Sequence, residues 1–309
     1  MLKKSKIILT LLLITARVFS QQDPLITHFY LMRTAINPAN SGMEAEVSIN
    51  LLTHQQWIKF EGAPSTSILS VDMPLSLANE SFGVGINFFN DKYGFVQDFK
   101  AAMTFSYIKQ LGAGRLSLGF SPLFFNEKFN SEWKFPDQPE SILPANSEAS
   151  TLDFNAGIIY EVNNFHVGFS GTHLLRPILN FGGADKYGSL KLVNHFYTEI
   201  SYSVNIEKYA IDFTPSIFAK TVGNNLQFEL NFLTLYNKKF WVGVSYRNKS
   251  AMSLQVGTYL KNIKVGASYD LPLNNINRVS WGSFELYLGY NFSFVKSAEI
   301  QKYKNVKTL

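Results

Sequence analysis

The sequence predicts an all-β protein, an antiparallel up-and-down transmembrane β-barrel of about 14 strands with an N-terminal plug-like segment. Three observations lead to this fold class. Aromatic residues make up 15% of the chain and charged residues only 17%, below the roughly 25% of soluble domains. Almost all of residues 45–294 alternates between apolar and polar or small side chains, as strands with two unlike faces do. The connections are short on one side and long on the other, as in outer-membrane barrels.

The start of the chain has the parts of a secretory signal peptide: a basic beginning, an apolar run at residues 7–14, and small or neutral residues before Gln21. We expect a signal peptide over residues 1–20, cleaved after Ser20. The apolar run is too short for a membrane anchor. The absence of cysteine excludes a lipoprotein anchor and leaves stability to the fold itself. The net charge of +5 comes from leader and tail lysines, so it does not indicate nucleic-acid binding.

The alternation predicts strands of nearly the length that a tilted strand needs to cross a membrane. Their expected ranges are 45–53, 66–74, 82–90, 95–109, 115–128, 151–162, 165–174, 190–206, 209–220, 225–236, 240–247, 252–260, 263–270 and 283–294. A two-sheet sandwich would also alternate and is the main rival. One predicted face favours a wet lumen because it carries small residues and the ionisable groups Asp153, Glu199, Asp212, Glu229, Lys264 and Glu285. The other face has tyrosines where a bilayer interface would lie, namely Tyr160, Tyr202, Tyr246 and Tyr269.

The connections predict the orientation. The expected inside turns are tight and fall at residues 111–114, 163–164, 207–208, 237–239 and 261–262. The long connections, 129–150, 175–189 and 271–282, would lie outside. We therefore expect an outer-membrane protein with extracellular long loops and both termini in the periplasm. The expected layout after the leader is an N-terminal segment over 21–44, in the lumen or at the periplasmic mouth, a barrel over 45–294 and a basic periplasmic tail over 295–309.

The five histidines do not have zinc-ligand spacing with cysteine, and none forms an HExxH pair. His195 and Ser201 share one face of a predicted strand, but about 20 Å separates them at roughly 3.3 Å per residue, which excludes direct contact. A catalytic pairing of a histidine with a serine on another strand stays open. The glycines of "FGVG", Phe82–Gly85, and "FGG", Phe181–Gly183, lack the strand–loop–helix context of a phosphate loop. We interpret the first pair as lumen-side strand glycines and the second as loop. We expect no catalytic residue, cofactor or metal.

Two stretches near the start carry a family resemblance. "QQDPLITHFYLMRTAINPANSG", followed by "HQQWIKFEGAPSTSILSVDMPL", resembles the PorP/SprF family of Bacteroidetes, and the closing "SFELYLGYNF" is similar to that family's last strand. Lys59 stands where a small residue is common. The positions that match the family motif are Gln22, Asp23, Pro24, Asn37, Pro38, Ala39, Gly42, Gln56, Trp57, Gly62, Ala63, Pro64 and Thr66.

The resemblance implies an outer-membrane β-barrel of the type IX secretion system. It implies a non-catalytic protein that binds the C-terminal sorting domain of a secreted surface protein or adhesin and supports its secretion or surface attachment. The alternatives are a structural link to periplasmic secretion or gliding-motility motor components, and a solute channel. The implied partners are thus the sorting domain, periplasmic secretion components and membrane lipid, with no nucleic acid. The motif residues would be structural or partner-binding.

Within this motif, "INPANSG" is predicted to be the turn before the first strand, with Pro38 and Gly42 setting the bend. "HQQWIKFEGAPS" is predicted to be the first outside connection. Trp57 would either pack at the barrel rim, which we favour, or contact a partner.

Overall fold

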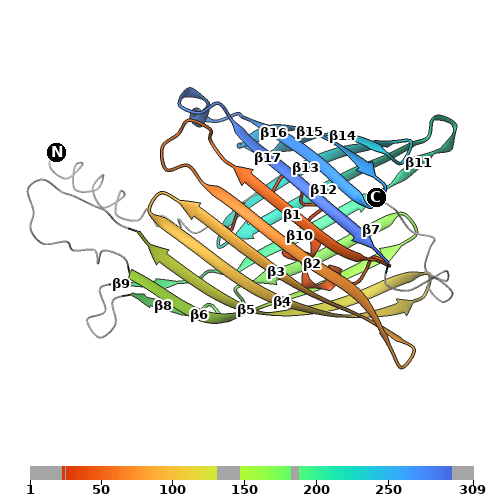
Figure 1. The fold of residues 1–309 in the computed structure, drawn as a ribbon, viewed down its shortest axis with the longest axis horizontal. Coiled ribbons are helices and arrows are strands. Elements are labelled where there is room, and N and C mark those ends of the chain that lie inside the picture. The colour runs from red at the N-terminus through yellow and green to blue at the C-terminus, as the bar shows by residue number, and fades with distance from the viewer. Residues whose placement is uncertain (1–22, 25, 131–146, 182–187, 294–309) are drawn as a thin grey trace, which may run out of the picture.

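A closed barrel of 14 antiparallel strands makes up most of the protein (Figure 1). The computed structural model describes residues 23–24, 26–130, 147–181 and 188–293. Neighbours in the chain pair with one another, and the ring closes where β10 pairs with β12, while the first strand pairs with the last. Closure leaves no strand edge in the hydrocarbon, where each unpaired backbone group costs several kcal/mol. The predicted barrel is confirmed, and the two-sheet sandwich is excluded.

The strands of the barrel have the following bounds: β1 (Val47–Gln55), β2 (Ser65–Leu77), β3 (Glu80–Tyr93), β4 (Val96–Leu111), β5 (Gly114–Phe129), β6 (Ser147–Val162), β7 (Phe165–Thr172), β10 (His195–Tyr202), β11 (Val204–Ile206), β12 (Ile211–Val222), β13 (Asn225–Tyr236), β14 (Phe240–Arg247), β15 (Ala251–Leu260), β16 (Ile263–Pro272) and β17 (Ser283–Phe292). The other elements are β8 (Ile178–Phe181), β9 (Gly188–Lys191), the α2 turn (Arg33–Ile36) and the 3-10 turns η1 (Pro38–Asn40), η3 (Glu207–Tyr209) and η4 (Asn275–Arg278). Among the described residues, helices that combine the length and the apolar character needed to cross a membrane are absent.

One predicted strand is wrong at its start. The strand expected over 190–206 begins only at His195, because residues 188–191 pair with β8 in a separate two-stranded sheet. The same strand is interrupted between β10 and β11. The pairing with β12 is missing at Tyr202 and Ser203, which the register places opposite Pro215 and Thr214, and proline has no N–H to donate to the ladder.

The turn between β2 and β3 is also tighter than the expected strand ends at residues 74 and 82 predict. β2 continues through Pro74 to Leu77, and β3 begins at Glu80. A two-residue turn at Ala78 and Asn79, with φ of 52° and 63°, joins them, as in a type I′ hairpin. The paired register of β2 with β1 ends at Asp72, so Pro74 lies at a margin where proline is tolerated.

The two faces of the wall are reversed relative to those of a soluble protein. In β17, Glu285 is 1% exposed and its neighbour Leu286 is 45% exposed. The same alternation continues along the other strands, with polar side chains inward and apolar side chains outward. This arrangement is that of a membrane barrel with a polar interior. The predicted lumen carboxylates Asp153, Glu199 and Glu229 are all buried.

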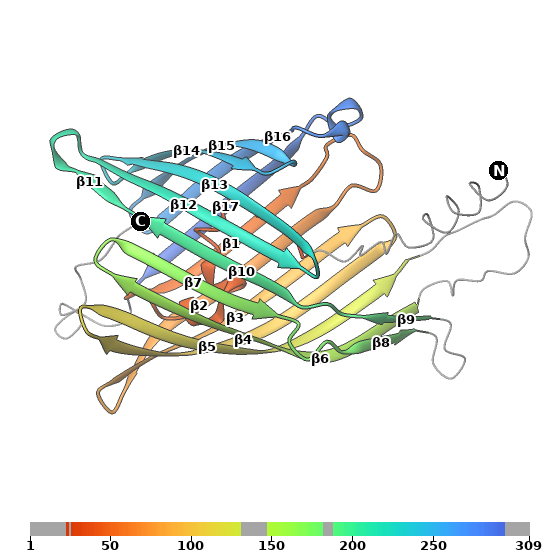
Figure 2. The same ribbon diagram turned by 180° about the vertical axis from the view of Figure 1, so that it is seen from behind.

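The two ends of the barrel differ in their connections. The short-turn end has tight turns after β2, β4, β6, β13 and β15. The long-loop end has residues 56–64, residues 173–194 with the β8–β9 hairpin, and residues 273–282 with η4. Most of the expected long connection 129–150, the leader 1–20 and the tail 295–309 lie outside the described residues. Figures 1 and 2 both show the red N-terminal part of the chain inside the ring of strands.

Candidate functional site: the N-terminal segment in the barrel lumen

The N-terminal segment, residues 23–43, runs along the lumen from the long-loop end towards the short-turn end. Asp23 lies beside Thr172 and His195, the residues at the long-loop ends of β7 and β10. At the other end, the carbonyl of Met43 accepts a hydrogen bond from Arg115, one residue into β5. The described residues nearest the two termini, Asp23 and Ser293, thus lie towards opposite ends of the barrel.

The carboxylate of Asp23 is the centre of a buried polar cluster. It accepts hydrogen bonds from the Tyr197 hydroxyl at 2.7 Å and from the Lys100 ammonium, and it lies 2.5 Å from Nδ1 of His195. The Lys220 ammonium donates to the backbone carbonyl of Asp23 at 2.6 Å. Lys100 comes from β4, Tyr197 and His195 come from β10, and Lys220 comes from β12. One residue of the N-terminal segment is therefore tied to three strands, through its side chain to β4 and β10 and through its backbone carbonyl to β12.

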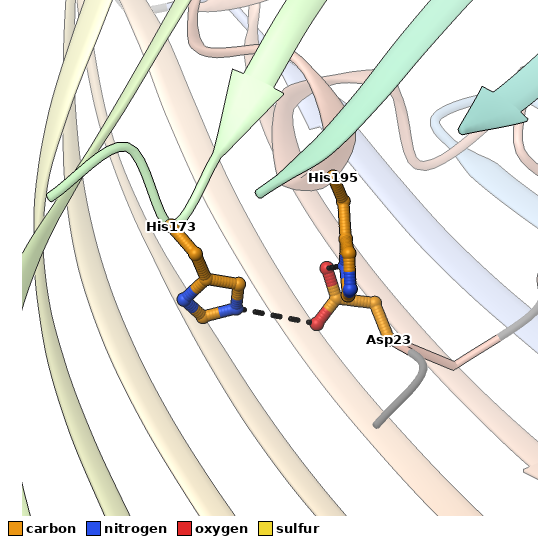
Figure 3. A group of neighbouring side chains, drawn as sticks. All are labelled: Asp23, His173 and His195. Carbon is orange, nitrogen blue, oxygen red and sulfur yellow. Dashed lines mark hydrogen bonds and ion pairs between the residues drawn. The ribbon is translucent and has the colours of Figure 1, made fainter. Parts of the chain in front are cut away.

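A second histidine completes this cluster, as Figure 3 shows. Nε2 of His173 lies 3.5 Å from Oδ1 of Asp23, and its Nδ1 lies 2.8 Å from Asp153. Burial by itself raises the pKa of Asp23, but Lys100, His195 and the histidine hydrogen bonds hold that pKa well below its usual range. The Asp23 carboxylate is thus ionised at neutral pH and attracts the cationic partners around it.

The same three side chains form a possible metal-ligand set. Donor atoms of Asp23, His173 and His195 lie within 4.8 Å of one another, and imidazole and carboxylate ligands are those that zinc accepts. However, the oxygens of Asp23 already accept hydrogen bonds from Lys100 and Tyr197. A divalent ion would meet the Lys100 ammonium at the same carboxylate and be repelled by it. The arrangement therefore fits an anchor for the N-terminal segment better than a metal site.

A second anchor holds the next turn of the segment against the opposite wall. The backbone N–H groups of Thr27 and His28 donate to the Glu285 carboxylate at 3.0 Å and 2.8 Å. The Thr27 hydroxyl donates to Asp270 at 2.9 Å and accepts from Arg247 at 3.2 Å. All five residues are buried. Such a network is costly to disrupt because each polar group would be left without a partner in the interior.

The predicted turn "INPANSG" docks on glycines of the barrel wall. Asn37 caps η1 by accepting from the backbone N–H of Ala39 at 3.0 Å, and it donates to the carbonyl of Phe169 at 3.2 Å. A Cβ at Gly157 would lie 1.9 Å from the Asn37 side chain, and one at Gly119 would lie 2.2 Å from the Ala39 nitrogen. The turn fits only because these wall positions lack side chains.

The end of the turn, at Ser41 and Gly42, also lies against a wall glycine that leaves room for its backbone. Gly42 has φ of +67°, and its N–H donates to Asp72 at 3.0 Å. A Cβ at Gly83, the first glycine of "FGVG", would lie 1.9 Å from the Ser41 carbonyl. That carbonyl accepts a hydrogen bond from Ser106 at 2.6 Å. The predicted lumen-side position of Gly83 is confirmed, and its role is to let the segment approach β3 and β4 closely.

The second half of the family motif lies elsewhere, in the loop after β1. The N–H of Gln56 donates to the carbonyl of Pro64 at 2.9 Å, which closes the loop. Gly62 has φ of +71°, and its carbonyl accepts from Gly94 of the neighbouring turn at 2.8 Å. Ala63 donates to Phe60 at 3.2 Å within the loop. These residues therefore shape the loop itself.

This first loop is joined to the last loop of the barrel. The Ile58 N–H donates to the Gly282 carbonyl at 2.8 Å, and the Trp281 N–H donates to the Ile58 carbonyl at 3.0 Å. The Lys59 ammonium lies 3.1 Å from the centre of the Trp281 ring, a cation–π contact. We call residues 56–64 and 273–282 together the paired-loop surface.

Trp57 is half-buried in the paired-loop surface. Its N–H donates to the Ser283 hydroxyl at 3.2 Å, and its ring meets the Phe60 ring edge-on at 6.1 Å between centroids. These contacts fit packing at the rim and leave part of the ring accessible. The two predicted roles of Trp57 both remain compatible with its position.

The predicted site residues thus fall into two groups. The structure places Asp23, Pro24, Asn37, Pro38 and Gly42 in the lumen, with Pro38 at the first position of η1 and Pro24 beside Asp23. It places Gln56, Trp57, Gly62, Ala63 and Pro64 in the loop after β1. Sequence reasoning missed the wall residues that receive Asp23, which are Lys100, His173, His195, Tyr197 and Lys220. The distance along the chain between Asp23 and His195, 172 residues, gives no local signal of their meeting.

The chain is similar to known proteins in sequence and in fold. The family model described as "Type IX secretion system membrane protein PorP/SprF" matches residues 18–290. No curated protein matches the chain. Similar solved structures include Omp33 of Acinetobacter baumannii, with 8% identity, 82% of this chain and 100% of that chain covered, and a TM-score of 0.46. BamA of Haemophilus ducreyi lacking POTRA domains 1–3 has 10% identity, with 81% and 71% covered and a TM-score of 0.45.

Proposed function

This chain belongs to the PorP/SprF family of type IX secretion system membrane proteins, and we propose that it is a non-catalytic outer-membrane barrel that binds the C-terminal sorting domain of a secreted surface protein or adhesin. On this proposal it supports the secretion or surface attachment of that protein. The long-loop end faces the cell exterior, and the short-turn end faces the periplasm. Residues 1–20 are removed as a signal peptide, and residues 295–309 form a periplasmic tail.

The observation that carries the proposal is the paired-loop surface. Its exposed aromatic side chains include Phe60, 42% exposed, and Trp281, 63% exposed. Aromatic side chains on a fixed support are typical anchors of protein interfaces. The backbone bonds between the two loops hold these rings in place before a partner arrives, which lowers the entropy cost of binding.

The β8–β9 hairpin supports the same proposal. Within the described residues it forms its own two-stranded sheet, so each strand has an edge without a strand partner. An edge of this kind can accept a strand of another protein through backbone hydrogen bonds. The exposed side chain of Ile178 at the start of β8 adds apolar surface beside it.

Co-purification from cells tests the proposal. The unchanged protein should retain a secreted protein with a C-terminal sorting domain, and the double variant Phe60→Ser with Trp281→Ser should retain at least about tenfold less, since one interface anchor contributes about 2 kcal/mol or more. Tyr209→Ser is the matched control, because Tyr209 is an exposed aromatic residue at the opposite, short-turn end. Retention of no secreted protein, together with normal surface display in a strain without the gene, would contradict the proposal.

The second candidate is a structural link to periplasmic components of the secretion or gliding machinery. Exposed apolar residues at the short-turn end favour it, with Leu77 and Tyr209 on projecting turns. In that case Leu77→Ser and Tyr209→Ser would abolish co-purification with periplasmic components and leave the sorting domain bound. A solute channel is less well supported, because the N-terminal segment occupies the lumen.

A further inference from the structure

The connection from β7 to β10, residues 173–194, carries the β8–β9 hairpin, and its two ends meet at Asp23. His173 is the first residue after β7, and His195 is the first residue of β10. The Asp23 carboxylate lies between them, 3.5 Å from Nε2 of His173 and 2.5 Å from Nδ1 of His195. Figure 3 shows the two rings approaching this carboxylate, one from the connection just after β7 and one from the start of β10.

The two ends of this connection are held differently. The first end is tied to β6 through Asp153. One carboxylate oxygen of Asp153 lies 2.8 Å from Nδ1 of His173, and the other accepts a hydrogen bond from the Leu175 N–H at 3.1 Å. At the second end, Nε2 of His195 is buried without a hydrogen-bond partner among the described residues. The polar contact that its ring makes is therefore the one with Asp23. Asn194 adds one hydrogen bond, to the His173 carbonyl at 2.6 Å.

The β8–β9 hairpin depends on these ends for its orientation. Its strands are not part of the barrel ladder. They rest on the wall through an apolar cluster of Leu179, Phe181 and Leu192 with Phe125 and Ala149. Apolar contact is non-directional, so it holds the hairpin down without fixing its angle. Direction comes from the ends of the connection, through the backbone pairing of Thr172 with His195 and through the polar contacts of His173, Asn194 and His195.

We propose that Asp23 is a positioning residue that clasps the two ends of this connection and thereby sets the angle of β8 and β9 at the long-loop end. The part of this inference that concerns partner binding rests on the proposed function. With the clasp closed, the edges of β8 and β9 present one fixed geometry to an incoming strand of the sorting domain. Because Asp23 belongs to the N-terminal segment, docking of that segment in the lumen and the shape of the partner surface are coupled.

Hydrogen exchange of the full-length barrel in detergent tests the clasp. In Asp23→Ala and Asp23→Asn, the amides of β8 and β9 should exchange roughly tenfold faster or more, while those of β3–β5 stay unchanged. His195→Phe removes the contact from the wall side and should have the same effect without altering the N-terminal segment. Asp91→Asn is the control, because Asp91 is a buried lumen carboxylate that accepts from Thr66 and contacts neither end of the connection.

Three results would overturn the clasp or its coupling to binding. Unchanged exchange of β8 and β9 in assembled Asp23→Ala and His195→Phe proteins rules the clasp out. Acceleration of the unchanged protein by EDTA, reversed by Zn²⁺, would show that a metal and not the direct contacts holds the cluster. Equal sorting-domain retention by Asp23→Ala, despite faster exchange, would overturn the coupling. Retention of no sorting domain by the unchanged protein contradicts only the proposed function, because the exchange experiment decides the clasp by itself.

Discussion

Wall glycines decide how closely the N-terminal segment approaches the barrel. Replacing Gly119 with Ala would place a methyl group against the backbone nitrogen of Ala39, 2.2 Å away. Backbone cannot move aside as a flexible side chain can, so we expect a loss of about 1–3 kcal/mol. Thermal unfolding and limited proteolysis of residues 23–43 measure it.

Gly188→Ala is the control for this prediction, because a Cβ there meets nothing within 4 Å. It should leave both the unfolding temperature and the protease resistance of the segment unchanged. Equal stability of the two variants would mean that the turn "INPANSG" is not docked on β5.

Glu285 makes a second prediction at the scale of single residues. Glu285→Ala would leave the N–H groups of Thr27 and His28 without their acceptor, and it would remove a carboxylate from the buried set around Arg247. Removing one partner of a buried charged network costs about 3–5 kcal/mol. Chemical unfolding in detergent should show a loss of this size, and a loss below about 1 kcal/mol, as for a surface pair, would contradict it.

Sequence reasoning located most of these residues without finding their partners. Alternation placed Glu229 and Glu285 on the polar face because a strand has a period of two residues. It cannot tell which strands face one another across the lumen, since that depends on how the ring closes. The family motif marked Asp23 and Asn37 but gave no hint of His173, Gly119 or the other residues that receive them.

At the scale of elements, the N-terminal segment and the barrel wall fill the lumen together. We expect the unchanged protein to show no steady conductance in planar bilayers. Deleting residues 23–42 removes the residues that contact β3–β7, β10 and β12, so the variant should conduct if it assembles. Heat-modifiable migration on gels checks assembly. Steady conductance of the unchanged protein would contradict an occupied lumen.

The strands themselves were largely predictable, and the exceptions have local physical causes. The tight turns at residues 163–164, 237–239 and 261–262 lie where polar pairs interrupt the alternation. β8 and β9 were missed because strands of four residues are too short to establish a period. Pro74 seemed to end a strand that in fact continues past the end of its pairing with β1 while staying paired with β3.

At the scale of the whole molecule, the unequal ends imply one orientation in the membrane. The chain has no cysteine, so a single introduced cysteine is the sole thiol. Lys249→Cys at the long-loop end should react with a membrane-impermeant maleimide on intact cells, and Asn262→Cys at the short-turn end should react only after lysis. Both positions are exposed turns, so they differ mainly in the side of the membrane. The reverse labelling pattern would invert the proposed orientation.

The long-loop end is proposed to bind a secreted sorting domain. The most direct measurement of this binding is the affinity of the purified barrel for an isolated C-terminal sorting domain, compared with the double variant Phe60→Ser and Trp281→Ser. We predict saturable binding by the unchanged protein, a loss of at least about tenfold in the variant, and no loss in Tyr209→Ser. Binding that is unaffected by the long-loop change but abolished by Tyr209→Ser, or no binding at all, would contradict the claim.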